Sequence, residues 1–403
     1  FPDTIPAANR LEVLKTAMMG GANAHTQGGR TFRRGMERIP TGRPSWNSAM
    51  RQAAVETLDS KRWVKGPKVA AFGTAFAAHS GALNAHPCQN GSSSLWAALR
   101  IAGIGPGDEV IVPSYTFIST ATCIELVGAT TVFVDVEPDY FCLDIVSVKN
   151  AITSRTKAVI GVHLFGQPYA PELIDLCEKE GLVLVEDAAQ AHGASQDIGG
   201  GRRRVAGSMG DIGCFSFFPS KNMAVGGEGG MLTTTKDIYS EKLSGITNHG
   251  RSPNLEAMEL GSNLRMSEVS AAIGLVQLGH LDGWVARRNA IAQQYTTALE
   301  HHRFLNAPRV RPGAYHAWHQ YCVQTKHAAE FVKHMDGHSI DARRYYTMPI
   351  HCQHVFQNHP QFEANFPVTE RLGASLVAIP VMHELTDMEI ERVIDALNSF
   401  HPE

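Results

Sequence analysis

The sequence predicts an α/β fold in which a largely parallel β-sheet is covered by helices on both faces. Short, almost continuous apolar segments rich in β-branched residues, such as LVLV at residues 182–185, predict strands that are buried on both sides. Helical patterns separate these segments, and such alternation is typical of parallel strands joined by crossover helices. The length of 403 residues exceeds that of one ordinary domain, so we expect a second, smaller domain.

The chain begins with a segment that has no clear secondary-structure pattern. Residues 1–45 include GGANAHTQGGRTFRRG, in which glycines, polar residues and a basic cluster occur without helical periodicity. We expect either an arm that lies on the body of the molecule or on a partner subunit, or a mobile tail. Two helices follow. The first spans residues 45–59 with Ser45 as its N-cap, and the second runs from about Phe72 to near Gly81.

From Ala85 onward, strand and helix patterns alternate. Strands are expected at residues 109–113, 130–136, 157–164, 182–185, 214–218 and 230–234. Helices are expected at residues 93–101, 116–127 and 171–180. This order predicts one mostly parallel sheet with helices on its two faces.

A change of composition near residues 300–313 (HHRFLNAPRVRPG) marks the predicted domain boundary. A long helical region at residues 267–298 precedes it, and a strand at residues 319–324 follows it. Two helices around a short strand at residues 376–380 complete the chain. We therefore divide the chain into an N-terminal arm (1–45), a large α/β domain (46–300) and a smaller C-terminal α+β domain (301–403).

The composition excludes several classes of protein. Lys and Arg number 36 and Asp and Glu 39, and the net charge of -3 argues against a generally basic nucleic-acid binder. No apolar stretch reaches the roughly 18 residues of a membrane span, and residues 1–10 lack the pattern of a secretory signal. The seven cysteines form no CxxC pair, and the 19 histidines show no HExxH spacing. We therefore expect a cytoplasmic enzyme with reduced, mostly buried thiols and no metal site.

Two residues that follow predicted strands have the chemistry of a catalytic site. Asp187 ends the apolar strand in LVLVEDAAQ, where a buried carboxylate needs a partner such as a protonated ring nitrogen. A cap on the next helix is an equally good interpretation of Asp187. Lys221 follows the strand in CFSFFPSK, and partial desolvation would lower its pKa and suit it to form a Schiff base. An ordinary surface lysine in a turn is the competing interpretation of Lys221.

Three further segments complete a set of binding groups. Residues 90–94 (NGSSS) precede a helix, so their N–H groups and hydroxyls form either an anion site or a plain N-cap. Phe117 in PSYTF follows another strand and either stacks on a flat ring or packs in the core. The GGEGG turn at residues 226–230 lacks the Lys-Ser/Thr of a phosphate loop, so we expect a tight turn that lines the site. An anion cradle, a ring platform, an acid and a Schiff-base lysine together match the needs of pyridoxal 5'-phosphate (PLP).

Several strings resemble the DegT/StrS-type sugar aminotransferase family. They are NGSSSLWAALRIAGIGPGDEVIVPSYTFISTA, EDAAQAHGA, GSMGDIGCFSFFPSKN, GEGG and GSNLRMSEVSAAIG. The resemblance extends from about Trp63 to the C-terminal VAIPVMHELTDMEIERVIDAL. It implies a PLP-dependent transferase of fold type I, with a mostly parallel seven-stranded type of sheet in the large domain and a smaller α+β domain.

The resemblance also implies roles for individual residues. Lys221 matches the lysine that forms the Schiff base with PLP, and Asp187 matches the partner of the pyridine nitrogen. Gln190 matches the residue near the phenolic oxygen of the ring, and Phe117 the stacked aromatic. The residues that match the phosphate site are Gly91, Ser92, Ser93, Ser216 and Asn263. In the family the asparagine comes from the neighbouring subunit, which implies a homodimer with shared sites.

Four residues fall in segments that shape the substrate pocket of the family: His249, Arg265, Tyr346 and His351. A surface or core role is equally consistent for each of them. The three arginines at residues 202–204 depart from the family pattern, and they either contact a phosphate of the substrate or form a solvated loop.

We therefore expect ping-pong transamination from L-glutamate or L-glutamine to a keto-sugar or ketocyclitol. Such a reaction belongs to amino-sugar or aminocyclitol biosynthesis, for a natural product or a cell-surface glycan. A sugar dehydratase of the same family is the nearest competing function, but those enzymes have histidine in place of the lysine at position 221. An amino-shikimate-type aromatising enzyme and a non-catalytic PLP-binding regulator are two further candidate functions.

Overall fold

The structure is a computed structural model that describes residues 37–252, 254 and 256–402. Most of the predicted N-terminal arm, residues 1–36, lies outside the described residues. The remainder of the arm lies on C-terminal elements. Ile39 pairs with Ile340 in a parallel bridge, and Arg38 forms an ion pair with Asp341 at 2.5 Å.

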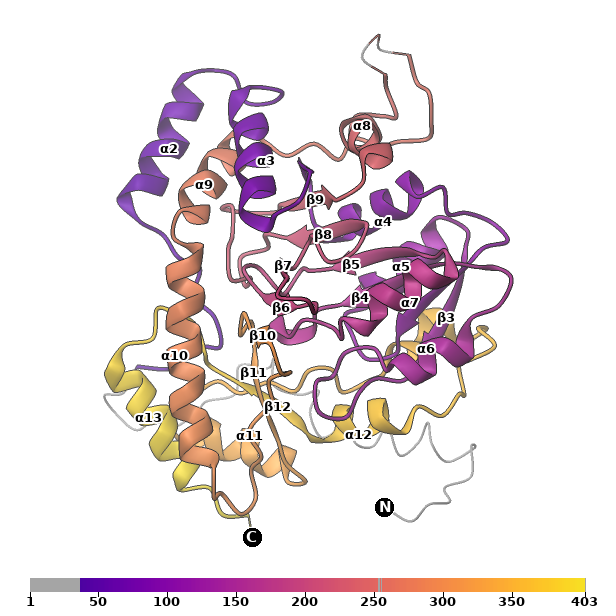
Figure 1. The fold of residues 1–403 in the computed structure, drawn as a ribbon. Coiled ribbons are helices and arrows are strands. Elements are labelled where there is room, and N and C mark those ends of the chain that lie inside the picture. The colour runs from indigo at the N-terminus through magenta and orange to yellow at the C-terminus, as the bar shows by residue number, and fades with distance from the viewer. Residues whose placement is uncertain (1–36, 253, 255, 403) are drawn as a thin grey trace.

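A seven-stranded sheet forms the centre of the molecule (Figure 1). In spatial order its strands are β1 (Asn84–Cys88), β9 (Gly230–Thr234), β8 (Ile212–Ser216), β5 (Val183–Asp187), β4 (Thr156–Val162), β2 (Glu109–Pro113) and β3 (Thr130–Val134). The five strands from β8 to β3 are parallel, and β9 is antiparallel to both of its neighbours. The predicted mostly parallel sheet is therefore confirmed.

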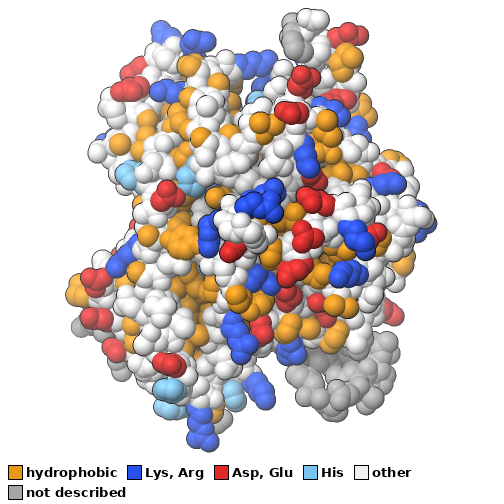
Figure 2. Space-filling model, viewed as in Figure 1, with side chains coloured by type: hydrophobic (Ala, Val, Ile, Leu, Met, Phe, Trp, Pro, Cys, Tyr) orange, Lys and Arg blue, Asp and Glu red, His pale blue; other side chains and the backbone are white. Residues whose placement is uncertain are grey.

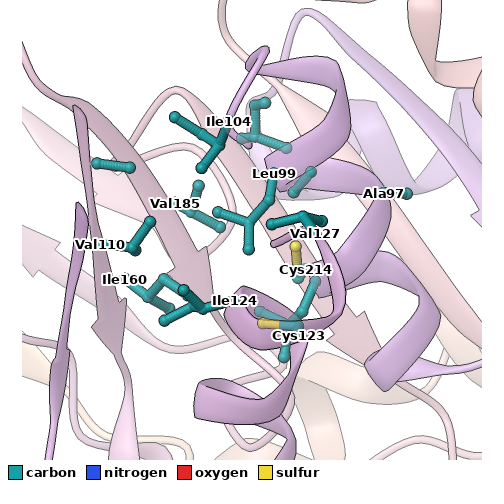
Figure 3. Packing of buried hydrophobic residues seen from close by; sticks show 14 of the residues in the cluster. Ala97, Leu99, Ile104, Val110, Cys123, Ile124, Val127, Ile160, Val185 and Cys214 are labelled. Carbon is teal, nitrogen blue, oxygen red and sulfur yellow. The ribbon is translucent and has the colours of Figure 1, made fainter. Parts of the chain in front are cut away.

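Helices cover both faces of this sheet, because successive strand residues point to opposite sides. Val110 packs toward α4 (Gly91–Ile101) and α5 (Ser119–Leu126), and Figure 3 shows this cluster with Leu99, Ile124 and Val185. Ile111 packs in a separate cluster with α6 (Ile145–Ala151) and α7 (Glu172–Glu180). Helix α8 (Asp237–Ile246) adds buried residues to the first cluster.

Four helices lie beyond the β1 and β9 side of the sheet or lead away from it. They are α2 (Ser48–Asp59), α3 (Pro67–Ser80), α9 (Glu268–Leu278) and α10 (Leu281–Leu299). Helix α3 ends at Gly81, as predicted, since Gly81 adopts the left-handed conformation with φ of 70°. The predicted N-cap Ser45 is wrong: Asn47 caps α2 by accepting the N–H of Met50 at 2.9 Å, while the Ser45 hydroxyl donates to Glu384.

The predicted helical region at residues 267–298 consists of two helices rather than one. Helix α9 ends at Leu278, and α10 begins at Leu281 after Gly279 and His280. Glycine has a low helix propensity, so a break at this position is inexpensive.

The C-terminal part combines helices with small sheets. Its helices are α11 (Ala328–Gly337), α12 (Pro367–Ser375) and α13 (Asp387–Asn398), and its two-stranded sheet pairs β11 (Tyr321–Gln324) with β12 (Leu376–Ile379). A three-stranded sheet joins β10 (Ala314–Tyr315), β6 (Ser195–Asp197) and β7 (Arg203–Val205). Tyr295 of α10 shares a core with Val377 and Val393. The predicted domain limits, 46–300 and 301–403, stay a prediction.

The cysteines and the surface agree with the composition. All seven cysteines are free and six of them are buried, which confirms that most thiols are buried, as expected. Lys and Arg side chains alternate with Asp and Glu over the face drawn in Figure 2. None of the helices in the described ranges combines the length and apolar character that a bilayer crossing requires.

Candidate active site

The carboxyl ends of three parallel strands bring sequence-predicted residues to one edge of the sheet. Asp187 is the last residue of β5, Ser216 is the last residue of β8, and Phe117 follows the end of β2. Lys221 comes after Ser216 in a turn, where its N–H donates to the carbonyl of Phe218 at 2.8 Å. Ligands of open α/β sheets bind at this edge, so these residues lie where the fold expects a site.

Asp187 is buried among neutral hydrogen-bond donors. The hydroxyl of Thr120 donates to its Oδ2 at 2.7 Å, and the N–H of Ala189 donates to its Oδ1 at 3.2 Å. Burial raises the pKa of Asp187, and the charge of Lys221 opposes this shift together with both hydrogen bonds. A bound cationic group in hydrogen-bond contact would therefore stabilise the ionised carboxylate.

The preceding residue, Glu186, points to the other side of β5 and has a structural role. Its carboxylate accepts from His163 Nε2 at 2.8 Å and from the N–H groups of Gly207 and Gly210 at 2.8 and 2.6 Å. All of these groups are buried. This clamp joins the end of β4 and the turn before β8 to β5, and so holds the backbone of Asp187 in place.

Lys221 has the character of a reactive amine. The residue is half-buried, and burial lowers its pKa to about 8, while the nearby Asp187 carboxylate acts in the opposite direction. The neutral form of the amine is therefore well populated in a mildly alkaline solution. A neutral amine is the form that acts as a nucleophile or a base.

The start of α4 and the end of β8 form a small cradle. Asn90 caps α4 by accepting the N–H of Ser93 at 2.8 Å, so this N–H is already occupied. The N–H groups of Gly91 and Ser92 have no partner inside the helix and suit an anion. A Cβ atom at Gly91 would come within 2.7 Å of the Cβ of Ser216, so only glycine lets the start of α4 approach the end of β8 this closely.

Gln190, Tyr346 and Phe117 form a polar and aromatic wall at the same edge. Gln190 Oε1 accepts the N–H of Phe165 at 2.7 Å, and its Nε2 donates to the Tyr346 hydroxyl at 3.1 Å. The ring of Tyr346 lies 6.4 Å from that of Phe117. Phe117 is 52% exposed, so one face of its ring is available for stacking on a ligand.

Asn263, His249 and Arg265 lie together, near β1 rather than at the end of β5. Asn263 pairs with Asn248 in an antiparallel bridge, and Arg265 Nη1 donates to Asn248 Oδ1 at 2.7 Å. Asn263 and His249 are exposed. Arg265 also pairs with Cys88 of β1, two residues before the Asn90 cap. These three residues therefore lie close to the end of β1, which leads into the Asn90 cap.

His351 lies in the core rather than on an open surface. It is fully buried, packs against the rings of Phe133 and Phe366, and contacts the thiol of Cys352 through Nε2 at 3.2 Å. Burial lowers its pKa to about 4, so this histidine is neutral at physiological pH.

The arginines at residues 202–204 belong to the β6–β7 hairpin. Arg203 donates to Ser195 Oγ and to the carbonyl of Gly313, each at 2.9 Å.

The GGEGG turn lies against the cradle, since a Cβ at Gly230 would come within 2.5 Å of the backbone of Asn90. This position agrees with the predicted role of the turn as a lining of the site.

Several residues at this edge were not found from the sequence. Thr120 bonds Asp187, the Ser119 hydroxyl lies 2.7 Å from that of Ser92, and Tyr115 donates to the carbonyl of Tyr345. The only available signal was the hydroxyl-rich string SYTFIST after the strand at residues 109–113. Hydroxyl residues are common in turns and caps, so that string has little specificity.

The described residues fit PLP in three ways. The N–H groups at the start of α4, beside the hydroxyls of Ser92 and Ser216, are donors that suit a phosphate. The buried Asp187 has neutral donors only as its hydrogen-bond partners, which suits a protonated ring nitrogen. The exposed ring of Phe117 suits a flat heterocycle. Among the described residues there is no cluster of His, Cys, Asp or Glu that could hold a metal ion.

Comparisons with known proteins identify the family of the chain. The profile of the DegT/DnrJ/EryC1/StrS aminotransferase family matches residues 44–398. The chain is 39% identical over 339 residues to a UDP-N-acetyl-3-dehydro-alpha-D-glucosamine 3-aminotransferase of Acidithiobacillus ferrooxidans, with 83% of this chain and 89% of the relative covered. It is 36% identical over 349 residues to a dTDP-3-amino-3,4,6-trideoxy-alpha-D-glucose transaminase of Streptomyces venezuelae, with 86% and 91% covered.

A solved structure supports the same assignment. The fold matches that of S. venezuelae DesV in complex with a ketimine intermediate, with a TM-score of 0.85, 33% identity, and coverage of 90% of this chain and 98% of that one. The family profile, these relatives and the fold agree, and the chain belongs to the DegT/DnrJ/EryC1/StrS family of aminotransferases.

Proposed function

We propose that this aminotransferase uses PLP to move an amino group from L-glutamate or L-glutamine to a keto-sugar or ketocyclitol. The observation that carries the proposal is the meeting of Lys221, Asp187 and the Gly91 cradle at the carboxyl edge of one sheet. The relatives named for dTDP- and UDP-linked amino sugars support a sugar as the acceptor.

In this proposal each residue has a distinct task. The N–H groups of Gly91 and Ser92 and the hydroxyl of Ser216 would hold the phosphate, and Phe117 would stack on the ring. Asp187 would keep the ring nitrogen protonated, because a cationic partner stabilises the ionised form of a buried carboxylate. When bound, PLP supplies the electron sink that makes a proton on the α-carbon of an amino acid acidic.

Lys221 moves the proton in both half-reactions. Its neutral amine accepts the proton from the α-carbon of the donor amino acid, and a pKa of about 8 makes this form accessible. The ammonium would return this proton to the cofactor carbon that receives the amino group, and in the second half-reaction the transfer would run in reverse, so that the former carbonyl carbon of the acceptor is protonated. The donor leaves as a keto acid before the acceptor binds, so the kinetics are ping-pong.

The proposed assembly is a homodimer in which Asn263 reaches the phosphate of the neighbouring subunit. Asn263 is exposed close to the end of β1, in a position to contact a second chain. Large apolar side chains are exposed on α2 and on the segments that flank α2 and α3: Trp46, Val55, Leu58, Trp63, Val64 and Leu83. Such a concentration of apolar side chains is typical of a surface that another chain covers.

A half-reaction assay tests the proposal. The purified chain with PLP is mixed with L-glutamate or L-glutamine, and the absorbance of the bound cofactor and the keto acid product are followed. Keto-sugars linked to dTDP or UDP, free ketocyclitols and an amino-shikimate-type substrate are then added in turn. If no amino donor changes the absorbance, the chain is not a transaminase of this type, and a regulatory or dehydratase function takes its place.

The variant Lys221→Ala should abolish both half-reactions, with a loss of at least about 10²-fold, because the amine that moves the proton is removed. Noncovalent binding of PLP should persist, since the cradle and Asp187 are unchanged. Keto acid release and equilibrium PLP binding measure the two effects separately. Full activity of Lys221→Ala would contradict the assigned role of the lysine.

A further inference from the structure

A short segment between β10 and β11 lies against the turn that carries Lys221. This strap comprises residues 316–320 (HAWHQ). Its backbone is bonded to the turn that follows β4: the N–H of Ala317 donates to the carbonyl of Gly166 at 3.0 Å, and the N–H of Gln320 donates to that of Phe165 at 3.2 Å. Phe165 in turn donates its N–H to Gln190, so the strap is connected to the wall of the site.

The other side of the strap is fixed to α10. Arg288 Nη1 donates to the carbonyl of Trp318 at 2.9 Å. Asn289 donates from Nδ2 to the carbonyl of His316 at 2.9 Å and accepts from Trp318 Nε1 at 3.0 Å. The strap is therefore held between the α10 helix and the large sheet by side chains and backbone groups that are mostly buried.

Asn222, the residue directly after Lys221, joins the Lys221 turn to this strap. Its Nδ2 donates to the carbonyl of Ala317 at 2.7 Å, and its Oδ1 lies 3.3 Å from Nδ1 of His319. Asn222 is buried, whereas Phe218 and Ser220 in the turn before Lys221 are exposed. Both polar atoms of the Asn222 amide therefore have a partner in the strap, at the point where the chain leaves the turn and enters the core.

We propose that Asn222 is a positioning residue that fixes the Lys221 amine by anchoring its turn to the strap. An exposed turn bonded only to itself would let the lysine move relative to Asp187. With the amide in place, the turn, the strap and the Gln190 wall form one connected unit. This role rests on the proposed chemistry of Lys221 and goes beyond it, because it assigns the placement of the amine to a neighbour.

In the part of the chain that the structure describes, few titratable groups act on Lys221. Asp187 faces it from the end of β5, His192 from the segment after β5, and His319 from the strap. Burial lowers the pKa of both histidines, that of His192 to about 3, so both are neutral. The charge of Arg288 acts on both histidines from α10. The pKa of the Lys221 amine therefore depends chiefly on the burial of the amine and on its attraction to the Asp187 carboxylate.

The test is the titration of the Lys221 amine in the full chain freed of cofactor, measured by competitive acetylation and mass spectrometry of the Lys221 peptide. In the native chain the midpoint should lie well below that of the surface lysines. In Asn222→Ala the turn loosens and water reaches the amine, so the midpoint should rise by about one unit, equal to a tenfold smaller fraction of free amine below the midpoint.

Asn289→Ala is the matched control, because it removes an asparagine that also holds the strap but does not touch the Lys221 turn. Both variants should lose a similar amount of stability toward denaturant, yet only Asn222→Ala should move the midpoint. An unchanged midpoint in Asn222→Ala, or an equal shift in both variants, would overturn the proposal.

Should Asn222→Ala fail to fold, His319→Asn serves as the second variant, since it removes one of the two partners and keeps the bond to Ala317. A smaller upward shift is then expected, and no shift would again overturn the proposal. Because the assay uses neither PLP nor substrate, its outcome is distinct from failure of the chain to transaminate.

Discussion

At the scale of single residues, Asp187 illustrates a group that is placed for binding at the expense of stability. Its carboxylate is buried, its hydrogen-bond donors are neutral, and burial raises its pKa above the ordinary value of 3.8. A carboxyl group whose pKa is raised by folding stabilises the folded chain while it is protonated. This stabilisation is complete below the ordinary pKa of 3.8, where the group is protonated in both the folded and the unfolded chain. That contribution is lost as the pH rises through the folded pKa.

The variant Asp187→Asn should therefore stabilise the cofactor-free chain at neutral pH, because it removes the buried charge. The gain over the native chain should be smallest below pH 3.8 and increase as the pH rises through the folded pKa of Asp187, by about 1.4 kcal/mol for each unit of the pKa shift. Denaturant unfolding at several pH values measures this difference. Transamination by the same variant should fall by orders of magnitude; a gain independent of pH would mean that folding does not raise the pKa of Asp187.

Asp187 and Lys221 could be found from the sequence because polar residues directly after apolar strands stand out. Thr120 and Asn222 could not, because a single hydroxyl or amide has no periodic or spacing signal, and its partner lies 67 or 95 residues away. The occupied N–H of Ser93 was also beyond sequence reasoning. Which N–H an Asn90 cap accepts depends on the backbone geometry of the first turn.

At the scale of elements, the first turn of α4 is the part of the fold most closely shaped for an anion. Asn90 caps the helix, Gly91 opens it, and Ser216 of β8 approaches within the distance that only a glycine permits. The close approach of a strand end to a helix start concentrates donors in a small volume. The positive end of the helix dipole adds to the attraction for a phosphate.

The variant Gly91→Ala should weaken PLP binding at least about tenfold, or roughly 1.4 kcal/mol, because the added Cβ would lie 2.7 Å from the Cβ of Ser216. Equilibrium titration of the cofactor-free chain with PLP, and competition by inorganic phosphate, measure the loss. Unchanged affinity for both ligands would place the anion site elsewhere.

Gly283→Ala provides the control for the same chemical change in another helix. Gly283 is exposed near the start of α10, and a Cβ there meets nothing within 4 Å. The variant should leave PLP affinity unchanged and raise the free energy of unfolding by about 0.5–1 kcal/mol, the usual gain of alanine over glycine inside a helix. Denaturant unfolding of Gly283→Ala and of the native chain measures this gain in stability.

The elements differed in how well their sequences revealed them. The limits of β2 and β9 were predicted to the residue, since both are apolar and β-branched. The alternation was expected to begin at Ala85, but no limits were predicted for strand β1 (NAHPC), because Asn and Pro disfavour strands and its extended form depends on its pairing with β9. Strands β6, β7 and β10 are three residues or shorter, which is too short for an alternating pattern to show.

At the scale of the whole molecule, Asn263 and several large apolar side chains are exposed on the single chain. Trp63 is 57% exposed and Val64 59%, values that are unusual for such side chains in a chain that stands alone. The sequence predicted the arrangement of sheet and helices well. Contacts with a second subunit depend on surface shape, which no local pattern records, and were implied by the family resemblance alone.

Mixing two inactive or impaired variants should restore activity if the sites are shared. In a mixed dimer of Lys221→Ala and Asn263→Ala chains, one site combines the intact Lys221 of one chain with the intact Asn263 of the other. Activity should then exceed the sum of the separate variants. Turnover after the two proteins are unfolded and refolded together measures the effect, with each variant refolded alone as the control. If Asn263 instead acts within its own chain, mixing should restore nothing.

Strand β5 ends with two acids that serve opposite purposes, as Glu186 clamps buried backbone on one side and Asp187 faces the ligand edge on the other. A side chain in a strand changes sides with every residue, so inserting or deleting one residue in β5 would exchange the two environments. His163 would then face the wrong carboxylate, and the reaction centre would lose its acid at the same time. Descendants of this chain can therefore tolerate length changes in the neighbouring loops far more readily than a single added residue within this strand.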